Sequence, residues 1–311
     1  MIHQEEIYDR MMGCLYGQAI GDALGLGTEF MSFDEVRRYY PQGLSEYGQI
    51  IQDSHRRRWP KGAWTDDTDM MLCLLSAFGT SGFDYNEAAR NFKRWYDGTP
   101  MGIGRHVVKV LMCGDYTDRP FDASKIMWEA TRRKSAANGG LMRTSVMGLW
   151  RHHNQDWVDN ACLLTHYDPR CVNSCRIVSE IIHNLVWLDI SLSKDEILAN
   201  VTDSELIEYI ETAYSSVSVR NLRLAEQPGI GYTYRTLGAA LWCYWHSLSF
   251  EDGLLAVVNE GGDADTNAAI ACAILGAKFG YKNIPTYYIE NLYNESEYRA
   301  KCEDFAKLAM L

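Results

Sequence analysis

Apolar residues recur three and four positions apart through most of the chain, which is the spacing typical of amphipathic helices. The pattern predicts helices over residues 203–222 and 236–248, and also over 68–78 and 176–190. In the first helix, the stripe expected to be buried consists of Leu206, Ile207, Ile210, Ala213, Tyr214 and Val217. In the second, it consists of Leu237, Ala240, Leu241, Tyr244, Trp245 and Leu248. Helix is therefore the dominant element expected.

Residues 266–279 form a fifth predicted helix, which is rich in alanine and carries small side chains on several faces. One of its stripes consists of Ile270, Ala273, Ile274 and Ala277. A helix of this kind can approach its neighbours closely, so we expect it at the centre of the molecule. Only residues 47–52 resemble a strand, and no fixed-period repeat or long linker is present. The sequence predicts an all-α protein with a single domain over residues 1–311.

Two acidic segments stand directly before predicted apolar helices. Residues 64–69 read Trp-Thr-Asp-Asp-Thr-Asp, and residues 261–267 read Gly-Gly-Asp-Ala-Asp-Thr-Asn. Helix capping is one interpretation, because Asp and Thr are favoured at helix starts, and for either segment alone it is as good as metal binding. Capping does not account for several carboxylates crowded into two such segments, since like charges repel.

A pair of divalent cations is the simpler explanation for both segments together. The ligands on offer are hard oxygens without His or Cys, which favours Mg²⁺, Mn²⁺ or Ca²⁺ over zinc. Two neighbouring cations, Mg²⁺ or Mn²⁺, are therefore expected as cofactors. The predicted metal ligands are Thr65, Asp66, Asp67, Asp263, Asp265 and Thr266.

At these residues the chain resembles the ADP-ribosylglycohydrolase family, and further motifs extend the resemblance nearly from end to end. Residues 17–25, followed by Glu29, resemble the opening helix of the family and its mobile acidic loop. Residues 138–143 resemble the segment that approaches the diphosphate, Thr165-His166 matches the family's His before a helix, and residues 231–237 resemble another substrate-lining segment. The resemblance implies an orthogonal helical bundle with a binuclear metal site in a central cleft.

The resemblance also implies roles for individual residues. Asp66 or Asp67 is expected to orient the attacking water, and Glu29 to assist the leaving group or to switch the site between open and closed states. The expected substrate-binding residues are Gly102, Asn138, Gly139, Gly140, Met142, His166 and Tyr232. The backbone at residues 138–140 carries no bulky side chain, so its N–H groups can approach a diphosphate. The alternatives are a turn before a helix for residues 138–140, a helix-capping role for His166 and a core position for Tyr232.

One segment departs from the family pattern. The family that this chain resembles includes members that cleave ADP-ribose from arginine, and some of these carry an acidic residue just before an Ile-Gly pair. Residues 100–105 of this chain read Pro-Met-Gly-Ile-Gly-Arg, which places Gly102 at that position. The acceptor is therefore left open between a protein side chain and a small ADP-ribosyl compound.

Composition narrows the remaining possibilities. The net charge of −11 argues against general nucleic-acid binding, which depends on a basic surface. The first residues lack the basic start and apolar core of a signal peptide, and no apolar run is long enough to cross a bilayer, so we expect a cytoplasmic protein, and a monomer. Nine cysteines without a Cys-x-x-Cys pair favour buried free thiols. The basic run His55–Arg58 is interpreted as a solvated loop, with contact to an anionic substrate as the alternative.

The function expected from these observations is hydrolysis of the bond between ADP-ribose and an acceptor on a modified protein or small molecule. Two alternatives come from other classes. One is a protein that binds ADP-ribose or blocks a toxin without turnover, and the other is a two-metal phosphohydrolase that cleaves the diphosphate. The products distinguish the three, because only the first releases free ADP-ribose.

Overall fold

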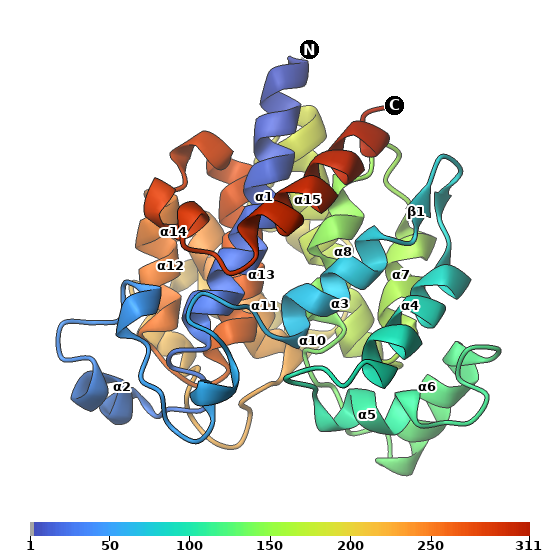
Figure 1. The fold of residues 1–311 in the computed structure, drawn as a ribbon, viewed down its shortest axis with the longest axis horizontal. Helices are drawn as coiled ribbons and strands as arrows, with labels where there is room; N and C mark the ends of the chain where they lie inside the picture. The colour runs from blue at the N-terminus through green and yellow to red at the C-terminus, as the bar shows by residue number, and fades with distance from the viewer. Residues whose placement is uncertain (1–2) are drawn as a thin grey trace.

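The computed structural model describes residues 3–311, and its regular structure is almost entirely helical (Figure 1). The α-helices are α1 (Gln4–Gly25), α2 (Phe33–Tyr39), α3 (Asp66–Leu75), α4 (Tyr85–Asp97), α5 (Arg105–Leu111), α6 (Pro120–Ala130), α7 (Gln155–Leu163), α8 (Pro169–His183), α9 (Lys194–Leu198), α10 (Ser204–Ser215), α11 (Thr233–His246), α12 (Phe250–Val258), α13 (Ala264–Phe279), α14 (Thr286–Glu290) and α15 (Glu295–Ala309). The all-α prediction is confirmed.

Short elements connect these helices. The 3-10 segments are η1 (Tyr47–Gln49), η2 (Arg56–Arg58), η3 (Leu141–Leu149), η5 (Val219–Leu222) and η6 (Tyr281–Asn283). A π-helical turn, η4 (Asn184–Leu188), continues α8. The only sheet of the described chain is an antiparallel hairpin of β1 (Phe78–Gly79) and β2 (Gly82–Phe83). All nine cysteines are free thiols.

Helices α1 and α13 form an antiparallel pair at the centre of the molecule (Figure 1). Four glycines spaced four residues apart make one face of α1 bare backbone, and a Cβ atom on any of them would lie 2.0 to 2.4 Å from a backbone oxygen of α13. The glycines are Gly13, Gly17, Gly21 and Gly25. The opposing oxygens belong to Gly276, Cys272, Ala268 and Ala264. The two backbones are therefore in direct contact along more than three helical turns.

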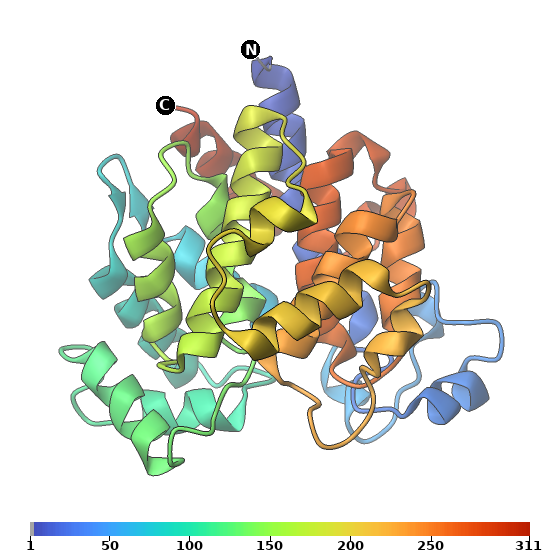
Figure 2. The same cartoon turned by 180° about the vertical axis from the view of Figure 1, so that it is seen from behind.

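The other helices are arranged around this central pair. Helices α11 and α12 pack on α13. Segments η3 and α8 contact each other, and both contact α13. The view from behind shows α8 and α10, coloured yellow-green and gold, in front of the central pair (Figure 2). Every residue from Ala264 to Ala277 is buried, which confirms the expected central position of the alanine-rich helix. Because α1 and α13 are antiparallel, the C-terminal end of α1 lies beside the N-terminal end of α13. This end of the pair carries the acidic residues discussed below.

Several details of the predicted elements are wrong. The helix predicted over residues 68–78 ends at Leu75, and Phe78 belongs to strand β1. Residues 47–52 do not form a strand: Tyr47–Gln49 form the 3-10 turn η1, which Glu46 and Gln49 cap reciprocally, and residues 50–52 are irregular. Helix α10 ends at Ser215, and Val217 is 93% exposed, because the following serines favour extended backbone and Ser218 caps η5. Helix α11 ends at His246 in the same way, which leaves Leu248 exposed.

Substitution of Gly17 by Ala tests the contact between α1 and α13. Ala is favoured over Gly in a helix interior by about 1 kcal/mol. The added Cβ would meet the Cys272 backbone oxygen at 2.0 Å, and overpacking of this kind costs about 1–3 kcal/mol or more when backbone must move. We expect Gly17→Ala to lower the free energy of unfolding in urea titrations by about 2 kcal/mol. Gly114→Ala is the control, since its Cβ would meet nothing within 4 Å; equal stability of the two variants would contradict the account.

Candidate active site

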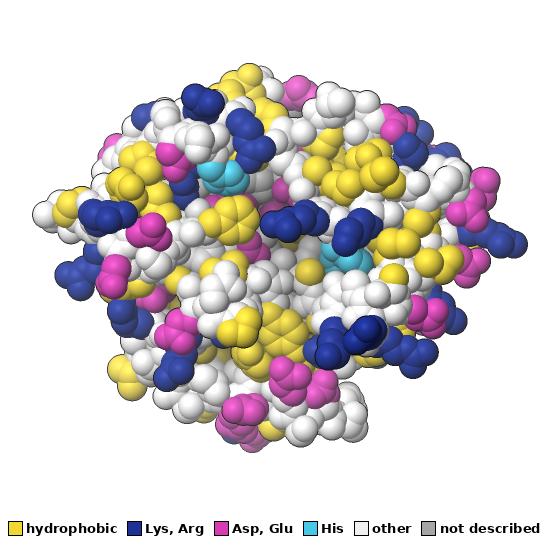
Figure 3. Space-filling view, turned by 90° about the horizontal axis from the view of Figure 1, so that it is seen from below, with side chains coloured by type: hydrophobic (Ala, Val, Ile, Leu, Met, Phe, Trp, Pro, Cys, Tyr) yellow, Lys and Arg dark blue, Asp and Glu magenta, His cyan; other side chains and the backbone are white. Residues whose placement is uncertain are grey.

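A cleft of about 380 Å³ opens where α1 ends and where α3, α5 and α13 begin. Seen from below, it is a hollow with acidic side chains in its depth and basic and aromatic side chains around its mouth (Figure 3). The predicted site residues that line it are Glu29, Thr65, Asp66, Asp67, Gly102, Asn138, Gly139, Met142, His166, Asp263, Asp265 and Thr266. The structure thus brings together segments that are more than 200 residues apart in sequence.

The first acidic segment forms the N-terminal turn of α3. Thr65 is the N-cap residue, and its hydroxyl oxygen accepts a hydrogen bond from the Asp67 backbone N–H at 3.4 Å. The Thr65 hydroxyl also donates to Asp67 Oδ2 at 3.2 Å. Asp66 Oδ2 accepts the Gly104 backbone N–H at 3.1 Å, which ties the start of α5 to the start of α3. Capping and a role in the cleft are therefore not exclusive, because Thr65 does both.

The third acidic residue of this segment has a different role. Asp69 accepts hydrogen bonds from the indole N–H groups of Trp64, at 2.8 Å, and Trp95, at 3.0 Å. It does not line the cleft. Its carboxylate therefore holds two aromatic side chains together. Of the three acidic residues in this segment, Asp66 and Asp67 line the cleft and Asp69 has this structural role.

The second acidic segment forms the N-terminal turn of α13, and the loop after α1 is fastened to it. The Phe30 N–H donates to the Gly262 carbonyl at 2.6 Å, and the Gly262 N–H donates to the Met31 carbonyl at 2.8 Å. Gly262 has a φ of +72° and sits against the Leu224 carbonyl, where a Cβ would be only 2.3 Å away, so glycine is required there. These contacts place the side chain of Glu29 over the start of α13.

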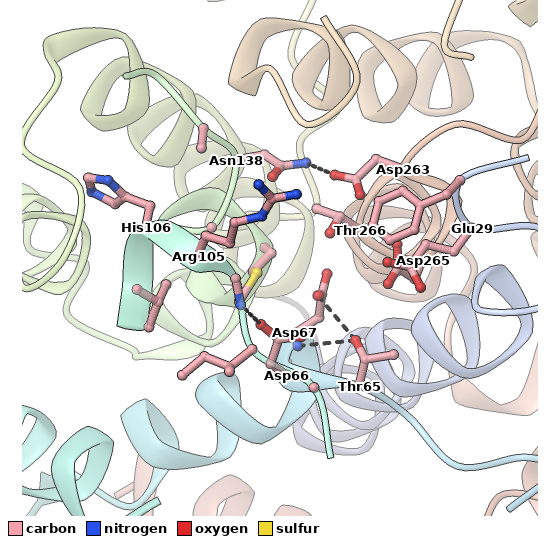
Figure 4. A pocket seen from close by; sticks show the side chains of 18 of the residues that line it. Glu29, Thr65, Asp66, Asp67, Arg105, His106, Asn138, Asp263, Asp265 and Thr266 are labelled. Atoms are coloured by element: carbon pink, nitrogen blue, oxygen red, sulfur yellow. Dashed lines mark hydrogen bonds between the residues drawn. The ribbon is translucent and has the colours of Figure 1, made fainter. Parts of the chain in front are cut away.

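Carboxylate oxygens of Glu29, Asp263 and Asp265 lie within 4.8 Å of one another, which is close enough to share a cation (Figure 4). Asn138 Nδ2 donates to Asp263 Oδ2 at 2.6 Å and orients that carboxylate. Within residues 3–311, the only basic side chain in hydrogen-bond contact with these three carboxylates is His55, whose Nε2 lies 2.6 Å from Glu29 Oε2. The negative charge of the site is therefore largely uncompensated by the described chain.

Two buried carboxylate oxygens at the site indicate that these residues suit a metal ion. Asp67 Oδ1 and Asp265 Oδ1 have no hydrogen-bond partner among the described residues. A buried polar atom without a partner is costly, and a carboxylate oxygen more so. The candidate metal ligands are the carboxylates and the hydroxyls of Thr65 and Thr266, which are all hard oxygens of the kind that Mg²⁺ and Mn²⁺ prefer. The residues present therefore fit divalent cations.

Burial shifts the acidity of these side chains strongly. Removal from water raises the pKa of Asp66 to about 6 and that of Asp263 to about 7. Burial, reinforced by neighbouring carboxylates, raises the pKa values of Asp67 and Asp265 well above the usual range. A group of carboxylates that resists ionisation in this way is stabilised by a cation.

Asp22 is a further buried carboxylate of the site, beyond the predicted ligands. It accepts hydrogen bonds from the Thr65 N–H at 2.9 Å, the Thr68 N–H at 3.0 Å and the Thr68 hydroxyl at 2.7 Å. Burial raises its pKa to about 7. Asp22 therefore anchors the start of α3 to α1. The signal available in the sequence was an Asp between glycine and alanine in an otherwise apolar helix.

The interpretation of residues 55–58 as a solvated loop is wrong for half of its members. Arg56 is 3% exposed, because its guanidinium donates to the backbone carbonyls of Leu26, Gly27 and Glu29. His55 contacts Glu29, as described above. Arg57 and Arg58 remain exposed, and Arg58 lines the cleft. A run of basic residues in the sequence does not indicate that the Arg56 guanidinium will bind backbone carbonyls of the loop after α1.

Gly102 lies at the mouth of the cleft, against Trp59. A Cβ on Gly102 would lie 2.8 Å from the Trp59 ring and 3.4 Å from Asp66 Oδ1. Trp59, which the sequence did not single out, is buried and lines the cleft. Its indole therefore fills the space that a side chain at position 102 would need.

The predicted diphosphate segment lines the cleft through Asn138 and Gly139, and the Asn138 side chain points toward Asp263 (Figure 4). A Cβ on Gly139 would meet the His166 ring at 2.8 Å, so the glycine lets the backbone pass close to that ring. Gly140 packs behind it, against Cys162 Sγ, and does not line the cleft. Tyr232 also lies outside the lining, with its hydroxyl donating to Glu205 Oε1 at 2.9 Å.

Two histidines stand side by side on this wall, with ring centroids 4.8 Å apart. His166 is buried, and burial holds its pKa well below the usual range, so its ring is neutral. Its Nδ1 lies 2.8 Å from the Thr165 hydroxyl. His106, which the sequence did not single out, must carry its proton on Nε2, because that atom lies 2.9 Å from the Thr165 carbonyl oxygen, which only accepts. The wall thus offers neutral polar groups rather than charges.

Comparisons with known proteins agree with this geometry. The family model described as ADP-ribosylglycohydrolase matches residues 3–311. The ADP-ribosylarginine hydrolase Tri1 of Pseudomonas putida (strain GB-1) is 29% identical over 93% of this chain and 75% of its own. The ADP-ribosyl-[dinitrogen reductase] glycohydrolase of Rhodospirillum rubrum is 27% identical over 98% of this chain and 97% of its own. A solved structure titled ADP-ribosylglycohydrolase-related protein complex superposes with a TM-score of 0.78 at 27% identity, covering 98% of this chain and 100% of that one.

The fold and the site thus define a helical glycohydrolase. The chain belongs to the ADP-ribosylglycohydrolase family, which confirms the resemblance found in the sequence. Among residues 3–311, no helix combines the length and the apolar character needed to cross a membrane.

The raised pKa values predict how stability depends on pH when metal is removed. Asp66 and Asp263 bind protons more tightly in the folded than in the unfolded chain, so their protonated forms stabilise the fold at about pH 4. This stabilisation is lost as the pH rises through about 6 and 7. In chelator, we expect the melting temperature to fall between about pH 4 and 7, and Mn²⁺ or Mg²⁺ to restore most of it at pH 8.

Asp265→Asn provides the matched comparison for this measurement. The variant removes one repelling carboxylate, so its metal-free form should be less sensitive to pH and its response to Mn²⁺ should shrink. A wild-type melting temperature that is indifferent to chelator and to pH over this range would show that the acidic residues act only as helix caps.

Proposed function

We propose that the protein is a divalent-cation-dependent hydrolase that releases ADP-ribose from an ADP-ribosylated protein side chain or small molecule. The observation that carries the proposal is the convergence of Glu29, Asp263 and Asp265, with unpartnered Asp67 and Asp265 oxygens, in a cleft of a chain of the ADP-ribosylglycohydrolase family. The names of the relatives from Pseudomonas putida and Rhodospirillum rubrum, both hydrolases of ADP-ribosyl groups, support it.

Two cations, Mg²⁺ or Mn²⁺, would be held between the starts of α3 and α13. The proposed ligands are Thr65, Asp66, Asp67, Asp263, Asp265 and Thr266, with Glu29 as a further oxygen donor. Bound divalent cations supply Lewis-acid polarisation of sugar hydroxyls and of water. The chain contributes rigid placement of the ligands, through the Asn138 contact to Asp263 and the Thr65 contacts to Asp67.

The carboxylates of α3 are proposed to handle the attacking water. Cleavage at the ribose anomeric carbon passes through a transition state that resembles an oxocarbenium ion, so a positioned base is needed on one face of the sugar. Asp66 has its Oδ2 held by the Gly104 N–H, and Asp67 has an oxygen without a partner among residues 3–311, so either can orient water and accept its proton. Glu29 is proposed to assist the departing acceptor, because it lies on a loop at the mouth beside His55.

The opposite wall is proposed to bind the rest of ADP-ribose. The backbone at Asn138 and Gly139, with Met142 and His166, faces the cleft and suits a diphosphate held by neutral donors. Gly140 is proposed to allow the close backbone packing behind this wall, and Tyr232 to contact adenine at the cleft's outer end. In this arrangement the acceptor leaves past Glu29 and Trp59.

Product analysis tests the proposal directly. The pure protein would be incubated with arginine- and serine-linked ADP-ribosyl acceptors, with and without Mg²⁺ or Mn²⁺, and the products separated by chromatography. We expect free ADP-ribose only when a cation is present. AMP and a phosphoribosylated acceptor would identify a phosphohydrolase instead, and binding of ADP-ribose without any product would identify a non-catalytic binding protein.

Substitution of Asp66 or Asp67 by Asn tests the role of the α3 carboxylates. Asn keeps the size and accepts a hydrogen bond but cannot take a proton from water, so we expect kcat to fall by roughly 100-fold or more. Affinity for ADP-ribose, measured by calorimetry with metal analysis alongside, should change far less. Asp69→Asn is the control in the same helical turn, since its carboxylate contacts two indoles outside the cleft. Near-normal turnover by fully metallated Asp66→Asn and Asp67→Asn would assign the catalytic carboxylate to Glu29.

A further inference from the structure

An anionic substrate faces an electrostatic difficulty in this cleft. The diphosphate of ADP-ribose carries negative charge, and the cleft is lined by five acidic residues, Glu29, Asp66, Asp67, Asp263 and Asp265. Cations bound among these carboxylates would offset their charge, but the diphosphate wall described above offers only neutral groups. A basic side chain that reaches into the cleft near that wall would make entry of a diphosphate favourable.

Arg105 is a side chain of this kind. It is the first residue of α5, it is exposed, and it extends into the cleft (Figure 4). Its guanidinium makes no hydrogen bond or ion pair with another part of residues 3–311 that the structure records. The neighbouring residues are both fixed, because the Gly104 N–H is bound to Asp66 and the His106 ring to the Thr165 carbonyl. Arg105 is therefore a free cation on an anchored backbone.

The other arginines near the cleft are already engaged. Arg58 stacks on the Trp59 ring at 4.5 Å and donates to the His55 carbonyl and ring, on the acceptor side of the mouth. Arg143 is fully buried and its guanidinium donates to the Gly139 and Ala161 carbonyls, so it supports the wall from behind. Arg105 alone among the cleft-lining arginines of the described chain lacks a partner of its own.

We propose that Arg105 binds the diphosphate of the substrate and makes the cleft selective for diphosphate-bearing ligands. This inference rests on the proposed function. A guanidinium presents paired N–H donors that match two phosphate oxygens, and such charge-assisted bonds are about twice as strong as neutral ones. Arg105 is thus a specificity-determining residue, which acts on binding of ADP-ribose rather than on the bond that is cleaved.

Calorimetric titration separates the phosphate contact from other roles. ADP-ribose, ADP and adenosine would each be titrated into Mg²⁺-loaded wild type, Arg105→Ala, Arg105→Lys and Lys109→Ala. Lys109 is the matched control, because it is an exposed cation one turn further along α5 and does not line the cleft. We expect Arg105→Ala to weaken ADP-ribose and ADP binding by roughly 10- to 100-fold and to leave adenosine binding within about twofold. Arg105→Lys should be intermediate, since it keeps the charge but loses the paired donors, and Lys109→Ala should resemble wild type.

Several results would overturn the inference. Equal affinity of wild type and Arg105→Ala for ADP-ribose would do so while leaving the proposed function intact, as long as wild type still releases ADP-ribose from an acceptor. An equal loss for ADP and adenosine would indicate a general disturbance of the cleft. A change in Mn²⁺ affinity alone would make Arg105 the counter-ion of the carboxylates rather than of the substrate. Failure of wild type to bind ADP-ribose at all would overturn both proposals.

Discussion

The direct backbone contact between α1 and α13 is the constraint on which the rest of the molecule depends. Glycines at every fourth position of α1 remove the side chains that would otherwise hold two helices 8–10 Å apart. The contact fixes the end of α1 against the start of α13, so the loop that carries Glu29 and the turn that carries Asp263 and Asp265 meet. Asp22, near the end of α1, then fastens the start of α3 to the same place.

This convergence creates a site that the chain does not satisfy by itself. Carboxylates from three elements are buried together, two of their oxygens have no partner within residues 3–311, and burial raises the pKa values of most of them. Burying these carboxylates together lowers the stability of the fold, and a bound divalent cation would offset that cost. The neutral wall formed around Asn138 and His166, with Arg105 beside it, complements the acidic floor. The cleft thus separates a region suited to cations from a region suited to a phosphate.

The sequence predicted the helices and the position of the two acidic segments at helix starts, because both depend on the local spacing of residues. It also predicted that Asp66 and Asp265 share a site, because the crowded carboxylates of the two segments are best explained by shared cations, and the family resemblance supported that prediction. The ends of α10 and α11 were missed because serine side chains compete with the helix locally. Asp22, His106 and Trp59 were missed because their roles arise only from tertiary contacts. The burial of Arg56 could not be predicted for the same reason, since its partners are backbone carbonyls.

The central claim is that the starts of α3 and α13 together hold two neighbouring divalent cations. Electron paramagnetic resonance of Mn²⁺ tests it directly, because two Mn²⁺ ions roughly 3.5–4 Å apart couple magnetically. The account predicts an exchange-coupled spectrum when two equivalents of Mn²⁺ are bound to wild type, and its replacement by single-ion signals in Asp265→Asn. A wild-type spectrum that contains only isolated or unbound Mn²⁺ at saturation would contradict it.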